Sequence, residues 1–263
     1  MWCRDVTTTK GTGVSLGGWL VQKSTIDLAF WLTHAPGASD EWTLCKTLGR
    51  RCGRGHQQKY LRRITEYAIR RYKMHVIIEA TGHWGWFYNE TAWAHSLNVM
   101  DEVLAFIGSS SSPGSFTLEP MKEPADRNRD DDLTMTVFGT PRRSLSVPLH
   151  SGLDVPLMLQ SFKLPEYWAG GFSRGDYIVF DVHNYYFEGR NTTSENLPGF
   201  IVSDARTKSG DGTFPAFVGE WERNLKFGCY WTAKFEGNGT IDGEGSQKDY
   251  WSFERFIKAG FLL

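Results

Sequence analysis

Residues 116–124, FTLEPMKEP, combine a short apolar run with two glutamates at and just beyond its end. The run from Phe116 to Glu119 is apolar on both faces, which is typical of a parallel strand buried beneath helices. In α/β barrels, the side chains at the carboxyl ends of such strands carry the function. This stretch therefore predicts a parallel α/β sheet with Glu119 and Glu123 at its functional edge.

Similar signals recur along the chain. Runs with strand character are predicted at residues 14–21, 75–79, 116–119, 155–160, 177–182, 215–219 and 227–232. Helical periodicity lies between several of them, at residues 40–48, which Gly49 ends, and at residues 57–72 and 91–107. This alternation predicts the α/β class and a (β/α)8 barrel of the TIM type, built as a single domain over residues 1–263.

The predicted barrel is incomplete. The strand signals are one fewer than a closed TIM barrel needs, and none falls between residues 21 and 75. A parallel crossover needs about a dozen residues, and the stretch between Gly219 and Phe227 is much shorter than that. Residues 127–154 show no helical period. We therefore expect one βα unit and some crossover helices to be missing.

Composition excludes several classes of partner. Lys and Arg total 29 against 30 Asp and Glu. The chain therefore carries no net positive charge that would favour binding to nucleic acid. No segment reaches the run of about 20 apolar residues that a membrane helix requires. The His and Cys spacings match no metal site, and the four cysteines are too few and scattered for a disulfide scaffold. We predict no metal and no cofactor.

The signals for localisation point in opposite directions. Residues 1–13 lack the apolar segment of a secretory signal, so no signal peptide is predicted. Three Asn-x-Thr sequons, at Asn89, Asn191 and Asn238, are meaningful only in an exported protein. Composition therefore leaves the compartment open.

A second strand-end carboxylate lies in residues 214–222, FPAFVGEWE, where Glu220 follows the apolar run. Two carboxyl groups about 5 to 5.5 Å apart can hydrolyse a glycoside with retention, one as acid and the other as nucleophile. From position alone, an ordinary solvated loop acid is the simpler interpretation of each glutamate. The residues around each glutamate distinguish between these two interpretations.

Several segments between residues 13 and 235 resemble glycoside hydrolase family 5, and within it the fungal exo-β-1,3-glucanase-like branch. In the family's order, they are GVSLGGWLV, DEWTLCKTLG, FTLEPMKEPAD, DVHNYYF, FVGEWE and YWTAKF. The resemblance implies that Glu123 is the acid/base and Glu220 the nucleophile. It also implies that His183 and Tyr185 lie near the nucleophile and that Trp231 stacks under the sugar of the first subsite.

The sequence departs from the family's pattern at functional places. Lys122 stands where the family has an Asn that bonds the sugar 2-hydroxyl, and it is the substrate-binding residue expected there. A lysine cannot accept a hydrogen bond, and its charge favours the ionised form of Glu123. The family's Arg-Ile-Pro segment is also absent. These losses coincide with the missing βα unit and indicate internal deletions from a family sequence.

The resemblance implies a retaining β-glycosidase that hydrolyses β-glucan, specifically an exo-acting glucan 1,3-β-glucosidase. It implies a monomer whose partner is a β-glucan polysaccharide or oligosaccharide, located outside the cell or in the cell wall. Two alternatives remain open. One is a catalytically inactive glucan-binding or vestigial family member. The other is a chain that does not fold stably, because an open barrel exposes two strand edges.

Overall fold

The computed structural model describes residues 12–17, 23–49, 54–80, 90–122, 153, 155–160, 172–173, 176–187, 189–209, 212–221, 228–241 and 245–260. The chain divides into two compact units. Unit 1 comprises Met1–Thr9, Arg62–Val182 and Ala205–Phe217, and unit 2 comprises Lys10–Leu61, His183–Asp204 and Val218–Leu263. The single catalytic domain expected from the sequence stays a prediction.

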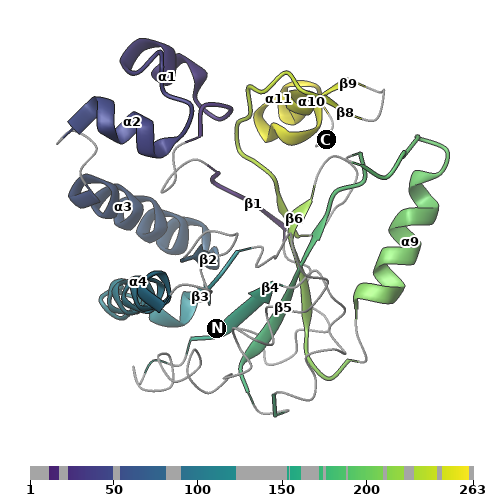
Figure 1. The fold of residues 1–263 in the computed structure, drawn as a ribbon. Helices are drawn as coiled ribbons and strands as arrows, with labels where there is room; N and C mark the ends of the chain where they lie inside the picture. The colour runs from purple at the N-terminus through teal and green to yellow at the C-terminus, as the bar shows by residue number, and fades with distance from the viewer. Residues whose placement is uncertain are drawn as a thin grey trace. The chain divides into compact units, whose positions relative to one another are not determined.

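The central feature is a seven-stranded parallel sheet with helices, drawn in Figure 1. Its strands are β1 (Thr12–Val14), β2 (Val76–Glu79), β3 (Phe116–Glu119), β4 (Leu157–Gln160), β5 (Ile178–Asn184), β6 (Ala216–Trp221) and β7 (Gly228–Tyr230). Their order in the sheet is β1-β7-β6-β5-β4-β3-β2. Each of the seven predicted strand regions contains or overlaps one of these strands, so the predicted TIM-barrel type of fold is confirmed.

Among the described residues, the strand order also confirms that the barrel is one strand short. β1 pairs with β7, as the first and last strands of a barrel do, whereas β2 lies at the other end of the sheet. Between β1 and β2, the described residues form helices α1 (Leu28–His34), α2 (Glu41–Leu48) and α3 (Arg54–Tyr72) and no strand. The other two predicted gaps, at residues 127–154 and between Gly219 and Phe227, lie largely outside the described part of the chain.

Two strand boundaries differ from the prediction. β1 ends at Val14, where the predicted strand began, because the chain turns at Gly17 and Leu16 is exposed. β5 continues past Val182 to Asn184, so it includes His183. Both differences arise where the chain leaves the apolar core, because hydrophobic patterning says least about residues outside that core.

The core of unit 1 lies between the sheet and two long helices. Phe116 and Leu118 of β3 are fully buried, and they share a cluster with Leu104 and Ile107 of α4 (Glu90–Gly108). Figure 1 shows α3 and α4 side by side next to β2 and β3. Arg62 of α3 fastens the two helices, because its guanidinium donates to the Ser109 hydroxyl at 2.8 Å. Because Leu104 and Ile107 of α4 are buried in the cluster, the apolar face that the sequence predicted for α4 is the buried one.

The predicted start and end of α2 are confirmed by its caps. At the N-terminus, the Asp40 carboxylate accepts from the Thr43 backbone N–H at 2.8 Å, and the Thr43 hydroxyl accepts from the Asp40 N–H in return. At the C-terminus, Gly49 has a φ of 55°, a conformation that favours glycine.

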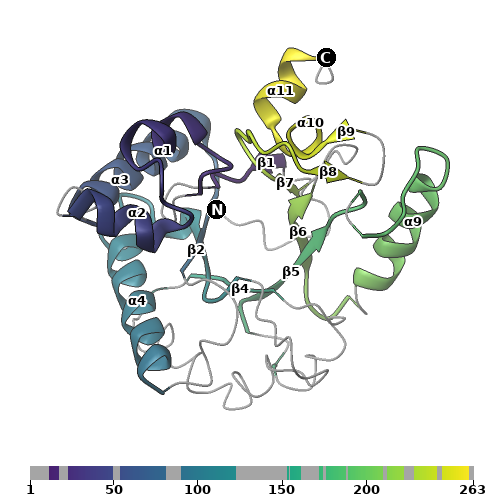
Figure 2. The ribbon, with the colours of Figure 1, turned by 45° about the horizontal axis from the view of Figure 1, so that its top comes forward.

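Unit 2 has an aromatic core that the sequence did not predict. Its buried members are Tyr186, Phe187, Leu197, Trp231, Phe235, Ile241, Tyr250 and Trp251. Figure 2 shows helices α10 (Gln247–Trp251) and α11 (Phe253–Lys258) beside the small antiparallel pair β8 (Thr240–Ile241) and β9 (Gly245–Ser246). The remaining elements are α9 (Leu197–Lys208) and the 3-10 helix η3 (Pro113–Ser115). Among the described helices, none combines the length and apolar character that crossing a bilayer demands.

Candidate active site

Glu220 lies one residue before the end of β6 and is almost completely buried, with a relative exposure of 2%. Strand ends of this kind place side chains at the functional face of an α/β barrel. A glutamate in such a position is rarely buried without partners, because desolvating a charged group is costly. Its contacts therefore indicate its role.

Two side chains, one at the end of the neighbouring strand β5 and one just beyond it, contact the Glu220 carboxylate at the same oxygen. The Tyr185 hydroxyl donates a hydrogen bond to Oε2, and Nδ1 of His183 lies 3.5 Å from this atom. Side chains two residues apart on an extended segment point to the same side, so His183 and Tyr185 approach Glu220 together. The structure thus brings together three of the residues expected at the site.

An aromatic support for this cluster was missed in the sequence. The ring of Trp251 packs edge-on against Tyr185, with a centroid separation of 5.9 Å, and against Phe235 at 5.2 Å. These contacts anchor the Tyr185 ring in the aromatic core of unit 2. The only signal in the sequence was the high aromatic content, which does not single out one tryptophan.

Trp231, the expected sugar platform, directly follows β7 and belongs to the same aromatic cluster. Its backbone N–H donates to the Trp221 carbonyl at 2.9 Å, and the peptide bond to Thr232 is cis. The Trp231 residue is 9% exposed. Most of the indole is therefore held by protein, as a fixed stacking surface requires.

Unit 1 contains a second group of polar residues at strand ends. Glu79 ends β2 and Glu119 ends β3, and the two residues are paired in the parallel register. Nζ of Lys122 lies 3.1 Å from Oε2 of Glu79. Glu79 was not among the site residues predicted from the sequence, although it closes the apolar run VIIE as Glu119 closes FTLE.

The Lys122–Glu79 pair gives the Lys122 ammonium a carboxylate partner within unit 1. The predicted electrostatic effect of Lys122 on Glu123 stays a prediction. Glu123 itself lies outside the described residues. Its assignment as acid/base remains a prediction from the resemblance.

Cys45 on α2 is disulfide-bonded. The sequence had excluded a disulfide scaffold and left the pairing of the four cysteines open, so this bond adds to the prediction. Among the described residues, no group of three or more His, Cys, Asp or Glu side chains is arranged to hold a metal ion.

Comparison with known proteins identifies the family. No protein-family profile matches the sequence, and no curated protein sequence matches it. The rutinosidase from Aspergillus niger is similar in structure, with 37% sequence identity and a TM-score of 0.86, over 98% of this chain and 99% of that one. AoRut is similar as well, at 37% identity and a TM-score of 0.84, with 97% of each chain covered.

The similarity extends over nearly the whole chain and agrees with the parallel sheet. These relatives support the glycoside hydrolase family that the sequence segments indicated, whereas the exo-β-1,3-glucanase branch has no such support. The chain therefore belongs to glycoside hydrolase family 5.

Proposed function

We propose that the chain is a retaining β-glycosidase that acts on a rutinoside, with Glu220 as the nucleophile and Glu123 as the acid/base. The observation that carries the proposal is the buried Glu220 carboxylate with Tyr185 and His183 on one oxygen. The substrate class follows from the similar rutinosidase of Aspergillus niger, whose name states that it acts on rutinosides.

The proposed chemistry proceeds in two displacements. Tyr185 and His183 hold Oε2 of Glu220, so we assign the attack on the anomeric carbon to Oε1. As the glycosidic C–O bond breaks, the proton of Glu123 goes to the leaving oxygen, and a glycosyl ester forms on Glu220. Glu123 then takes a proton from water, which attacks the same carbon and releases the sugar with its configuration retained.

The other site residues bind the sugar in this proposal. Trp231 offers an aromatic surface to the apolar C–H face of the pyranose ring. Lys122 presents N–H donors to a sugar hydroxyl, because its side chain is still 15% exposed beside Glu79. The chemistry needs no metal and no cofactor.

A β-1,3-glucan is the second candidate substrate. The segments from GVSLGGWLV to YWTAKF favour it, because they resemble the exo-β-1,3-glucanase-like branch of the family. On either substrate, we propose that the protein is a monomer and works outside the cell or in the cell wall. The disulfide at Cys45 supports export, because such bonds persist in oxidising compartments.

The test is hydrolysis of three substrates by the purified chain: rutin, laminarin and an aryl β-glucoside. Release of rutinose from rutin, lost in Glu220→Gln, is the expected result. Glucose release from laminarin alone would replace the rutinoside with a glucan. If a chain that unfolds cooperatively releases sugar from none of these substrates, the catalytic proposal is wrong and the protein is an inactive family member.

A further inference from the structure

Lys23 lies on the aromatic platform of the site. Its ammonium Nζ is 5.1 Å from the centroid of a Trp231 ring, over the ring face. A cation at this distance is attracted by the negative charge density of the indole face. The same face attracts the C–H groups of a sugar ring, so ammonium and sugar favour the same surface.

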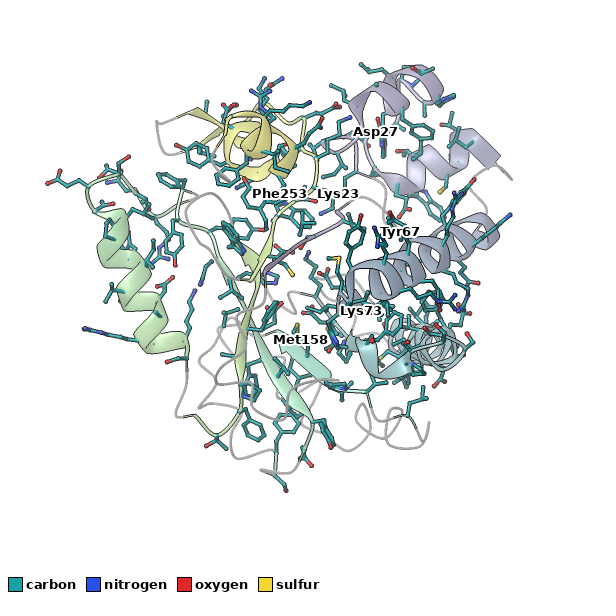
Figure 3. All side chains as sticks on the ribbon, turned by 180° about the vertical axis from the view of Figure 1, so that it is seen from behind. Lys23, Asp27, Tyr67, Lys73, Met158 and Phe253 are labelled. Atoms are coloured by element: carbon teal, nitrogen blue, oxygen red, sulfur yellow. The ribbon has the colours of Figure 1, made fainter. Side chains whose placement is uncertain are left out.

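The turn that carries Lys23 is held by hydrogen bonds to Glu236, which follows Trp231 in the chain. Lys23 and Asp27, labelled in Figure 3, lie at the two ends of this turn. The Thr25 carbonyl accepts from the backbone N–H of Glu236 at 2.7 Å. The Glu236 carboxylate in turn accepts from the N–H of Leu28 at 2.9 Å. Lys23 is thus presented by an anchored backbone, although its side chain is exposed.

The platform is fixed from another side by Gly17. A Cβ added at Gly17 would lie 2.7 Å from Cη2 of Trp231, closer than any packing contact allows. The Gly17 N–H also donates to the Thr232 hydroxyl at 2.9 Å. The indole therefore cannot shift toward the Gly17 backbone to make room for a ligand. A sugar that stacks on the face under Lys23 has to displace the ammonium itself.

We propose that Lys23 is a substrate-positioning residue: its ammonium leaves the ring face when sugar stacks on Trp231 and then donates hydrogen bonds to the hydroxyl groups at the sugar's edge. The inference rests on the proposed glycosidase function and deepens it. An ammonium has three donors and no acceptor, so it suits a neutral sugar rich in hydroxyl groups. Lys23 also lies outside the set of residues that the family resemblance supplied.

The decisive variant is Lys23→Met, which keeps the length of the side chain and removes its charge and donors. We expect KM for rutin to rise about five- to tenfold, less than for a buried charge-assisted hydrogen bond because the exposed ammonium is solvated before sugar binds, with kcat changed less than about twofold. Lys23→Arg should restore most of the affinity, because the guanidinium also donates. Lys258→Met is the matched control, because Lys258 is exposed on α11 and pairs only on the surface with Glu254.

Glu236→Ala tests the anchor of the turn. We expect it to raise KM about two- to threefold, because the Leu28 N–H loses its acceptor and the turn is held less firmly. The effect should vanish in the Lys23→Met background, because the anchor would then have no donor to position. An equal effect in both backgrounds would show that Glu236 acts only on stability.

Binding without turnover separates this inference from the proposed function. In the Glu220→Gln background, calorimetry with p-nitrophenyl β-rutinoside should give a Kd that rises by the same five- to tenfold on adding Lys23→Met. Hydrolysis by the wild type together with an unchanged or lower KM and Kd in Lys23→Met would overturn the inference alone. No hydrolysis and no binding by any form of the chain would overturn it together with the proposed function.

Discussion

Glu220 and Glu79 hold comparable positions in the sheet but have different surroundings. Both stand at the carboxyl end of a parallel strand, Glu220 on β6 and Glu79 on β2. Glu220 is buried and is contacted by the hydroxyl of Tyr185 and the imidazole of His183. Glu79 has a side chain that is 34% exposed and is paired with the ammonium of Lys122.

The difference shows that a position at a strand end does not by itself make a catalytic carboxylate. A hydroxyl and an imidazole orient the Glu220 carboxylate through a hydrogen bond and a close polar contact. An ammonium at 3.1 Å from Glu79 instead offsets its charge and ties the carboxylate to one partner. The partners of each glutamate therefore decide whether the group is suited to chemistry or to structure.

The largest expected effect comes from replacing Glu220 with glutamine, and the same replacement at Glu79 gives the comparison. Glu220→Gln should lower kcat on the order of 10³-fold or more, because an amide oxygen does not form the glycosyl ester. Glu79→Gln should lower kcat less than about tenfold, because this group touches no reacting atom in the proposal. Initial rates on rutin measure both, and comparable losses in the two variants would erase the distinction.

Tyr185→Phe sharpens the comparison at Glu220. We expect kcat to fall about 10- to 100-fold, because the carboxylate loses a hydrogen bond to a charged acceptor, worth about 1.5 to 3 kcal/mol. The Phe ring keeps the packing against Trp251, so the free energy of unfolding should change little. A urea titration of the same variant serves as the control. A kcat like that of the wild type would mean that the hydrogen bond is not used.

The pair in unit 1 should show a small coupling in stability. Glu79→Gln, Lys122→Met and the double variant form a thermodynamic cycle for this ion pair. We expect a coupling free energy of about 0.5 to 1 kcal/mol, because both side chains are partly exposed to solvent. Urea unfolding measures the four forms. An absent coupling would show that the charge of Lys122 is not offset by Glu79.

The smallest expected effect concerns Glu66, a carboxylate whose role is purely structural. Hydrogen bonds from the hydroxyl and backbone N–H of Ser111 lower the pKa of Glu66 from its usual 4.5 to about 2. A carboxyl group whose pKa is lower in the folded state stabilises the fold above pH 4.5, and this contribution is lost as the pH falls toward 2.

Protonating Glu66 should lower the free energy of unfolding by less than about 1 kcal/mol as the pH falls from 4.5 toward 2, because solvent screens this carboxylate. Glu66→Gln should remove the corresponding part of the pH dependence. Unfolding free energies of both proteins between pH 6 and pH 2.5 test this prediction. Parallel curves for wild type and variant would contradict it.

Much of the fold was readable from periodicity because buried parallel strands are apolar on both faces. The runs around Phe116, Ile178 and Ala216 each became strands, and the helix that ends at Gly49 was located by its cap. The lack of a strand signal between residues 21 and 75 was equally visible, and the described residues of that stretch form helices and no strand. Missed elements were those with weak patterns, including the short α10 and α11 and the two-residue strands β8 and β9.

The candidate site was only partly readable. Glu220, His183 and Tyr185 were located by their segments, and the structure brings them into contact. Trp251 and Lys23 were not located, because each meets its aromatic partner from a distant part of the chain. Side chains far apart in sequence carry no shared period or motif, so local patterns cannot pair them.

The sequence by itself determined the class of fold, the lack of a strand signal between residues 21 and 75, and the glutamates Glu119 and Glu220 at the ends of apolar runs. These properties depend on the local hydrophobic pattern and on residue type, and both can be read directly from the sequence. Only the tertiary structure decided which glutamate meets Tyr185, that Glu79 pairs with Lys122, and that Lys23 lies over Trp231. Such pairings depend on distances between separate elements, and these distances are fixed only when the elements pack together.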